Sequence, residues 1–287
     1  MDRTKFLVKP GTNIVLSKIS TSGTGSFKSE EDVKDILKKN IKKMTKLQNK
    51  LFAYDKYSLL IIFQAMDAAG KDGTIKHVMS GLNPQGTQVF SFKQPSLEEL
   101  DHDYLWRIHK YLPERGRIGI FNRSHYEEVL IARVHDLIKN QKIPPELINK
   151  EIWNTRYREI DDFEKYLYEN GTVILKFFLH VSKEEQKQRF LERIDQPEKN
   201  WKFSASDINE RKYWDKYQSA YGEAISATSK KHAPWFIIPA DHKWYMRYAV
   251  SQIIVETLEQ LDMSYPVLSK EMKAELEECK KNLLNEG

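Results

Sequence analysis

Residues 58–73 read SLLIIFQAMDAAGKDG, and this stretch decides the fold class. Its apolar part, Leu59 to Phe63, is too short for a typical helix and rich in strand-forming residues, so it predicts a buried strand. The next residues, Ala65 to Lys71, are mostly small and end in Gly-Lys, and Thr74 to Met79 has helical spacing. A strand, a loop of small residues and a helix form the context of a phosphate-binding loop, where backbone N–H groups and a lysine surround phosphate oxygens.

The loop departs from the pattern G-x-x-x-x-G-K-[ST] at two positions. Ala65 replaces the first glycine, and Asp72 replaces the Ser or Thr that usually holds Mg²⁺. A second carboxylate, Asp67, lies inside the loop. Because carboxylates repel phosphate unless a cation lies between them, we expect Mg²⁺ here, or Mn²⁺ in its place. The other interpretation of Gly70 to Gly73 is an ordinary turn, but the flanking strand and helix favour a phosphate site.

The composition is that of a globular protein, because 40% of the 287 residues are hydrophobic and 30% are charged. No apolar run approaches the roughly 20 residues of a membrane span, and the first residues lack a signal-peptide pattern. The single cysteine, Cys279, excludes an internal disulfide and indicates a reducing compartment. We therefore expect a cytoplasmic protein without a membrane partner. The formal net charge of +5 is compatible with an anionic substrate.

The order of predicted elements is that of an α/β protein. Residues 1–29 show little periodicity and are interpreted as an irregular arm, and residues 30–287 as one domain. Further strands are predicted at 87–92, 117–121, 172–179 and 234–239, and helices at 29–51, 74–79, 97–112, 144–169, 183–194 and 207–225, with another helix after Asn122 and two more at the C-terminus. Five short strands alternating with helices predict a parallel sheet covered on both faces, a P-loop kinase-like three-layer sandwich.

A second group of polar residues follows the strand that ends at Phe121. In open parallel sheets ligands bind at the carboxyl ends of the strands. Many phosphate-loop enzymes have a Mg²⁺-binding acid here, where this chain has Asn122, followed by Arg123. Glu127, about one helical turn later, could supply the missing charge, so the predicted metal site is Asp67, Asn122 and Glu127. The other interpretation is a helix cap at Ser124 with ordinary first-turn acids.

Residues 183–226 have the layout of a kinase lid, with two helical stretches joined by a polar loop. Arg189 and Arg193 are four residues apart and point from one face of a helix, and Lys199 and Lys202 follow in the loop. Cations that close over a transferring phosphoryl group stabilise its charge and exclude water. A charged loop that is simply solvated is the other interpretation.

Several motifs, in one order along the chain, resemble the polyphosphate kinase 2 family from about Asp32 to Leu261. They are Phe63 to Gly73, Asn83 to Gly86, Phe92 to Pro95, Ile120 to Ser124, Asp195 to Lys202, Ala233 to Trp235 and Pro239 to Trp244. The resemblance implies reversible, Mg²⁺-dependent phosphoryl transfer between inorganic polyphosphate and a nucleotide, without a covalent protein intermediate.

The resemblance also implies roles for individual residues. Asp67 and Lys71 would hold the metal and the reacting phosphates, and Arg123 and Arg133 would position phosphates. The lid would contribute Arg193, Asp195, Lys199 and Lys202. Asn122 with Glu127 resembles the subgroup that accepts both nucleoside mono- and diphosphates, so we expect AMP, ADP and guanine nucleotides as partners. The family analogy also suggests a homo-oligomer, either a dimer or a tetramer.

A polyphosphate chain carries roughly one charge per phosphate and has no base to recognise, so its expected site is a basic groove. The predicted phosphate-binding residues are Ala68, Ala69, Gly70, Lys71, Asp72, Gly73, Lys76, Arg133, Arg193 and Arg211.

Two other functions stay open at this stage. An ATP-dependent nucleoside monophosphate kinase would have a similar fold and lid, although Asp72 in place of Ser or Thr weighs against it. A nucleic-acid-binding module would also be basic, but the sequence has no recognised nucleic-acid motif, so we expect no such partner.

Overall fold

The computed structural model describes residues 3–286 and contains a five-stranded parallel sheet in the order β2-β3-β1-β4-β5. The strands are β1 (Ser58–Ala65), β2 (Thr87–Ser91), β3 (Ile118–Asn122), β4 (Thr172–His180) and β5 (Trp235–Pro239). All eight residues of β1 are buried, because β1 lies between β3 and β4 with helices on both faces. The predicted α/β class and the five parallel strands are confirmed.

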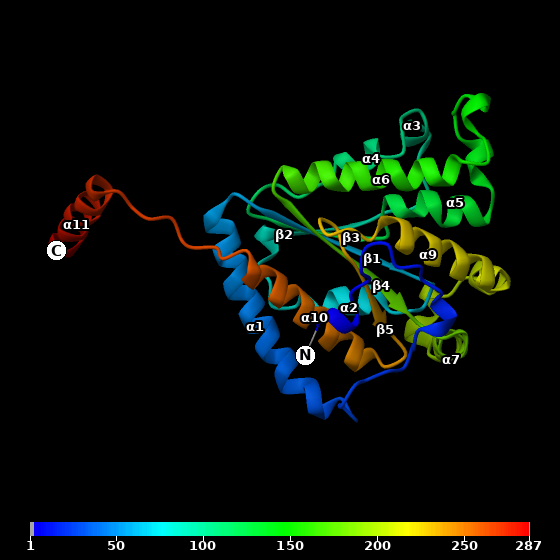
Figure 1. Cartoon of the computed structure of the whole chain (residues 1–287). Coiled ribbons are helices and arrows are strands. Elements are labelled where there is room, and N and C mark those ends of the chain that lie inside the picture. Colours follow the sequence, from blue (N-terminus) through cyan, green and yellow to red (C-terminus); the bar gives the residue numbers. More distant parts are fainter. Residues whose placement is uncertain (1–2, 287) are drawn as a thin grey trace.

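Helices cover both faces of the sheet (Figure 1). One face carries α1 (Glu31–Tyr54), α2 (Lys71–Val78) and α10 (Lys243–Gln260), and the other carries α5 (Ile131–Val134), α6 (Ile152–Glu169) and α9 (Trp214–Thr228). The remaining helices are α3 (Leu97–Leu100), α4 (Trp106–His109), α7 (Lys183–Asp195), α8 (Ala205–Glu210) and α11 (Lys270–Asn285). None of these helices, all within residues 3–286, is both long and apolar enough to cross a membrane.

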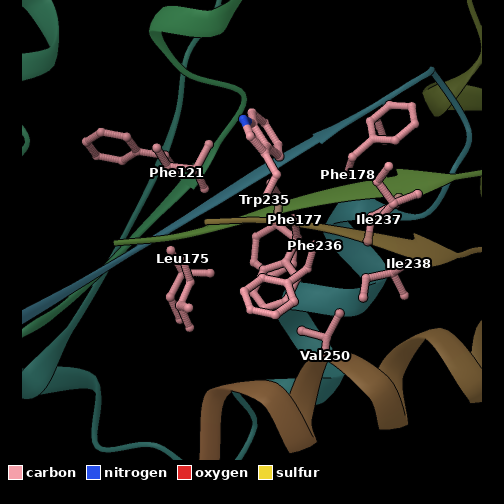
Figure 2. Packing of buried hydrophobic residues seen from close by; sticks show 14 of the residues in the cluster. Phe121, Leu175, Phe177, Phe178, Trp235, Phe236, Ile237, Ile238 and Val250 are labelled. Atoms are coloured by element: carbon pink, nitrogen blue, oxygen red, sulfur yellow. The ribbon is translucent and has the colours of Figure 1, made fainter. Parts of the chain in front are cut away.

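Alternation along the strands divides the core into two layers. Figure 2 shows Phe177 and Phe236 on the side of the sheet that faces Val250 of α10, and Trp235 on the opposite side. Phe177 stacks on Phe63 with ring centroids 5.3 Å apart. Side chains from the two faces therefore bury the central strands, whereas β2 at the edge of the sheet stays partly exposed.

Three of the predicted helices are shorter or broken in the structure. The helix expected at 97–112 is two short helices, α3 and α4, because Asp103 accepts a hydrogen bond from the backbone N–H of Leu105 and starts a new turn. The helix expected from Pro144 begins only at Ile152. The helix expected at 207–225 is divided into α8 and α9 by a 3₁₀ turn at Arg211–Tyr213.

The N-terminal arm is irregular, as expected, but it is packed on the domain. Phe6, Val8 and Leu16 belong to the buried core, and Leu7 forms an antiparallel bridge with Phe236 of β5. The arm therefore covers the edge of the sheet that β5 would otherwise expose.

A buried polar cluster holds the segment that follows β3. Lys176 in β4 donates to the hydroxyl of Tyr126 and to the backbone oxygen of Thr228, both at 2.8 Å, and forms an ion pair with Glu164 of α6. Tyr126 in turn donates to Glu164 at 3.0 Å. Because buried charges need partners, this cluster fixes the position of the chain just after Arg123.

Candidate active site

The loop between β1 and α2 has the bent backbone of a phosphate cradle. Ala68 and Gly70 both have left-handed conformations, with φ of 60° and 107°. A Cβ atom at Gly70 would lie 3.2 Å from the flexible methyl end of Met246, so the backbone conformation, more than space, requires glycine there. A left-handed alanine is strained, and strain of this kind gathers at functional sites.

Lys71 begins α2 and lies over the loop. Its side-chain nitrogen donates to the backbone oxygen of Ala65 at 3.0 Å. Burial lowers the pKa of this lysine, while the nearby carboxylate of Asp67 acts in the opposite direction. The amine is thus held against the loop that leads into α2, and the N-terminus of a helix favours an anion.

The neighbouring strand β3 brings Asn122 and Arg123 to the same place, because Phe63 of β1 pairs in register with Asn122. Arg123 has φ of 65° and forms an ion pair with Asp67 over 3.1 Å. The amide nitrogen of Asn122 donates to the Asp72 carboxylate over 2.7 Å. The two strand ends therefore form one cluster of alternating charges.

Glu127 completes this cluster from the 3₁₀ helix His125–Val129. Burial raises the pKa of its carboxyl group, and the cations Arg123 and Lys71 oppose that rise. The half-buried acid lies within electrostatic reach of Asp67 as well. The structure thus brings together six of the residues predicted for the site: Asp67, Lys71, Asp72, Asn122, Arg123 and Glu127.

The predicted metal ligands form an oxygen-donor set without being a preformed cage. Within residues 3–286 there is no group of three or more His, Cys, Asp or Glu side chains that could hold a metal ion. Two carboxylates and one amide oxygen nevertheless match the donors of Mg²⁺, which is commonly held by one or two carboxylates together with substrate phosphates and water. The residues present therefore fit Mg²⁺ bound together with phosphate.

Arg189 lies in a different place from the one expected of a lid cation. Its guanidinium donates to the backbone oxygens of Ala68 and Ala69 at 3.1 and 2.6 Å. It also donates to the backbone oxygens of residues 240 and 241 and forms an ion pair with Glu185. With only 4% of its surface exposed, it holds the backbone of the loop between β1 and α2 and has its guanidinium occupied by protein groups. The expectation that Arg189 and Arg193 act together in the lid is therefore wrong for Arg189.

A neighbouring contact supports the loop in the same way. Gln186 of α7 donates to the backbone oxygen of Asp67 at 2.8 Å, and Arg211 donates to the Gln186 side chain at 2.6 Å. Arg211, predicted as a phosphate ligand, thus contacts the loop through Gln186.

Most of the remaining predicted cations are paired with groups outside the cluster or are exposed. Arg193 is paired with Asp207 over 3.8 Å, and Arg133 with Glu223 and the hydroxyl of Tyr157, both over 2.7 Å. Lys76 is exposed on α2. In the lid loop Asp195 and Lys202 are exposed and Lys199 is half-buried, with Lys202 over the exposed ring of Trp201.

Residues that the sequence analysis did not single out also border the cluster. Burial, with Glu127 and Asp67 nearby, raises the pKa of Tyr221 well above its ordinary value. Burial and then Asp67 raise the pKa of Asp207. Tyr217 and Tyr221 lie one turn apart on α9, and this spacing could have indicated a shared face towards the site.

Comparison with known proteins identifies the family. Residues 27–266 match the family described as Polyphosphate kinase 2 (PPK2). This chain belongs to the polyphosphate kinase 2 family. The match covers most of the chain, so the chain is an enzyme of the phosphotransferase class, and the P-loop kinase-like fold is confirmed.

Relatives of the polyphosphate kinase 2 family match along almost their full length. An ADP-polyphosphate phosphotransferase from Rhodopseudomonas palustris is 51% identical over 282 residues, which is 98% of each chain. An AMP/ADP-polyphosphate phosphotransferase from Meiothermus ruber is 46% identical over 263 residues, 91% of this chain and 95% of that protein. The crystal structure of polyphosphate kinase 2 from Arthrobacter aurescens TC1 superimposes with a TM-score of 0.88 at 39% identity, covering 96% of this chain and 95% of that one.

Proposed function

We propose that this protein transfers a phosphoryl group from inorganic polyphosphate to nucleoside mono- and diphosphates, converting AMP to ADP and ADP to ATP, reversibly and with Mg²⁺. The observation that carries the proposal is the cluster at the ends of β1 and β3. There the cations Lys71 and Arg123 alternate with the acids Asp67, Asp72 and Glu127. The printed names of the two relatives described above support polyphosphate as the donor.

Phosphoryl transfer between phosphoanhydrides requires positioning and charge stabilisation more than covalent chemistry. The backbone N–H groups at the start of α2 and the Lys71 amine bind the phosphate oxygens. Arg123, held by Asp67 in the ground state, stabilises charge that develops on the transferred group. Arg193, Lys199 and Lys202 of the lid close over the reacting phosphates and exclude water from them.

Asp67, Asn122 and Glu127 would hold Mg²⁺, which neutralises phosphate charge when it is bound. The partners of the two acids explain how carboxylates can lie in a phosphate site. Asp67 and Asp72 would repel a bare phosphate chain, whereas in the proposed site each has a cationic or amide partner, Arg123 or Asn122.

Acceptance of both AMP and ADP is supported by Asn122 together with Glu127 and by the name of the Meiothermus ruber relative. The Glu127 carboxylate is half-buried in the cluster and provides the charge that Asn122 lacks. Glu127→Ala should reduce AMP phosphorylation more than ADP phosphorylation. An equal loss with both acceptors would remove the argument for this subgroup.

The decisive experiment crosses AMP, ADP and GDP with polyphosphate, each with and without Mg²⁺, and measures the nucleotide products. We expect ATP from ADP, polyphosphate and Mg²⁺, and ADP from AMP. Asp67→Ala should lower turnover by orders of magnitude with the fold intact. If wild-type protein makes no ATP from polyphosphate and ADP, the proposal fails.

The alternative function, an ATP-dependent nucleoside monophosphate kinase, is tested by an assay with ATP and AMP but no polyphosphate. Efficient formation of ADP in this assay would favour the alternative. Filter binding with DNA tests the non-enzymatic module, which predicts tight, salt-sensitive binding without turnover.

We further propose that residues 30–287 form one domain with its lid around 183–226, and that the protein is a homo-oligomer. The contact of α7 with the loop between β1 and α2 supports a lid that belongs to this domain, and the arm packs separately on β5.

A further inference from the structure

The C-terminal helix α11 stands away from the rest of the protein (Figure 1). It follows residues 261–269, which contain no helix or strand, and none of its described residues is buried. A helix of 16 residues is marginal in water by itself, because helices of this length gain most of their stability by packing an apolar face. α11 therefore lacks the contact that such a helix needs.

One face of α11 has the spacing of a short coiled-coil seam. Met272, Leu276, Cys279 and Leu283 follow one another at steps of four, three and four residues. Met272, Leu276 and Leu283 expose 51%, 55% and 66% of their surface, and Cys279 is exposed too. In heptad terms they occupy the d, a, d and a positions, which face a partner helix.

We propose that α11 pairs in parallel with α11 of a second copy of this chain. In a parallel pair, position g of one helix faces position e of the other, five residues further on. Glu275 is at g and Lys280 at e, so two opposite-charge pairs form by symmetry. An antiparallel pair that keeps the apolar residues in contact would bring Lys273 towards Lys280, two like charges. The charges thus select the parallel arrangement.

The seam is only about two heptads long, so the pairing should weaken on dilution. α11 carries no residue of the candidate active site, and the proposal is independent of the proposed reaction.

The first test measures the mass of the full chain by size-exclusion chromatography with light scattering over a dilution series. We expect an oligomer for the wild type and a smaller species for Leu276→Glu, which places a charge in the seam. Leu284→Glu is the matched control, because Leu284 is 76% exposed but lies outside the seam. A monomeric wild type, an unchanged mass for Leu276→Glu, or equal losses in both variants would overturn the proposal.

The second test examines register and charge. Glu275→Lys should shift the protein towards the smaller species, and Glu275→Lys/Lys280→Glu should restore the wild-type mass. Because Cys279 is the only cysteine of the chain, oxidation with copper phenanthroline in air should give a disulfide-linked dimer that Cys279→Ser cannot form. If no linked dimer appears, or if the double variant stays as small as the single one, the parallel pairing is wrong.

Discussion

Asn122 donates from its side-chain amide to the carboxylate of Asp72 over 2.7 Å. The hydrogen bond joins the end of β3 to the first turn of α2, fifty residues apart in the chain. It occupies the amide nitrogen and leaves the amide oxygen as an acceptor. An uncharged residue is therefore the one that can hold Asp72 in place while still offering an oxygen to a cation.

Asn122→Asp should lower the melting temperature in EDTA by a few degrees. The variant loses a hydrogen bond worth about 1 kcal/mol and places two carboxylates side by side. Mg²⁺ should recover more of the melting temperature in this variant than in the wild type, because a cation between the acids removes the repulsion. Calorimetry with and without Mg²⁺ measures both effects. In the control, Asn122→Ala, no charge is added, and an equal response of the two variants to Mg²⁺ would contradict the account.

Lys71→Met should reduce kcat about 100- to 1000-fold, because it removes a positive charge beside the reacting phosphates without changing side-chain length much. Steady-state kinetics with polyphosphate and ADP measure the loss, and circular dichroism checks the fold. Lys76→Met, on the exposed side of α2, is the matched control and should change turnover only a few-fold. Near-normal turnover of Lys71→Met would refute the site.

Arg189→Met should mainly reduce stability, whereas Arg193→Met should mainly reduce turnover. Breaking the buried contacts of Arg189 leaves Glu185 and several loop carbonyls unpaired, so the free energy of unfolding should fall by about 3–5 kcal/mol. Arg189→Lys should not restore this stability, because an ammonium group cannot reproduce the planar set of N–H donors of a guanidinium. Arg193→Met, at a half-exposed pair with Asp207, should lower turnover with little loss of stability. Urea denaturation and kinetics on the same samples separate the two; similar stability losses would contradict this division.

Activity should fall at acidic pH as Glu127 becomes protonated, at a pH above the ordinary value for glutamate, because burial raises its pKa. Stability should change with pH in the opposite direction to activity. The folded protein binds this proton more tightly than the unfolded chain does, so stability is lost as the pH rises from the unfolded pKa through the folded one.

Glu127→Gln should therefore be at least as stable as the wild type at neutral pH, while its turnover is strongly reduced and its pH–rate profile lacks this acidic limb. Denaturation at several pH values and a pH–rate profile test the two effects. An unchanged acidic limb in Glu127→Gln would assign that limb to another group.

Local patterns were sufficient to predict the sheet and the centre of the site. The apolar run of β1, the small residues before Lys71 and the Asn-Arg pair after β3 are each contiguous, and parallel strands bring their carboxyl ends to one edge. The same reasoning missed the breaks in the helices expected at 97–112 and 207–225. At 97–112 the hydrogen bond that Asp103 accepts outweighs a weak helical periodicity.

The sequence by itself determined which residues carry charge, where the strands lie and which of their ends meet at one edge of the sheet. Only the tertiary structure decided what each charge contacts. Arg189 and Arg193 have the same chemistry and spacing, yet one is buried beneath the loop and the other lies at the lid. Lys176 interrupts an apolar strand, and its partner, Glu164, lies on a helix packed against that strand. Such partners are set by through-space packing, which a linear pattern does not encode.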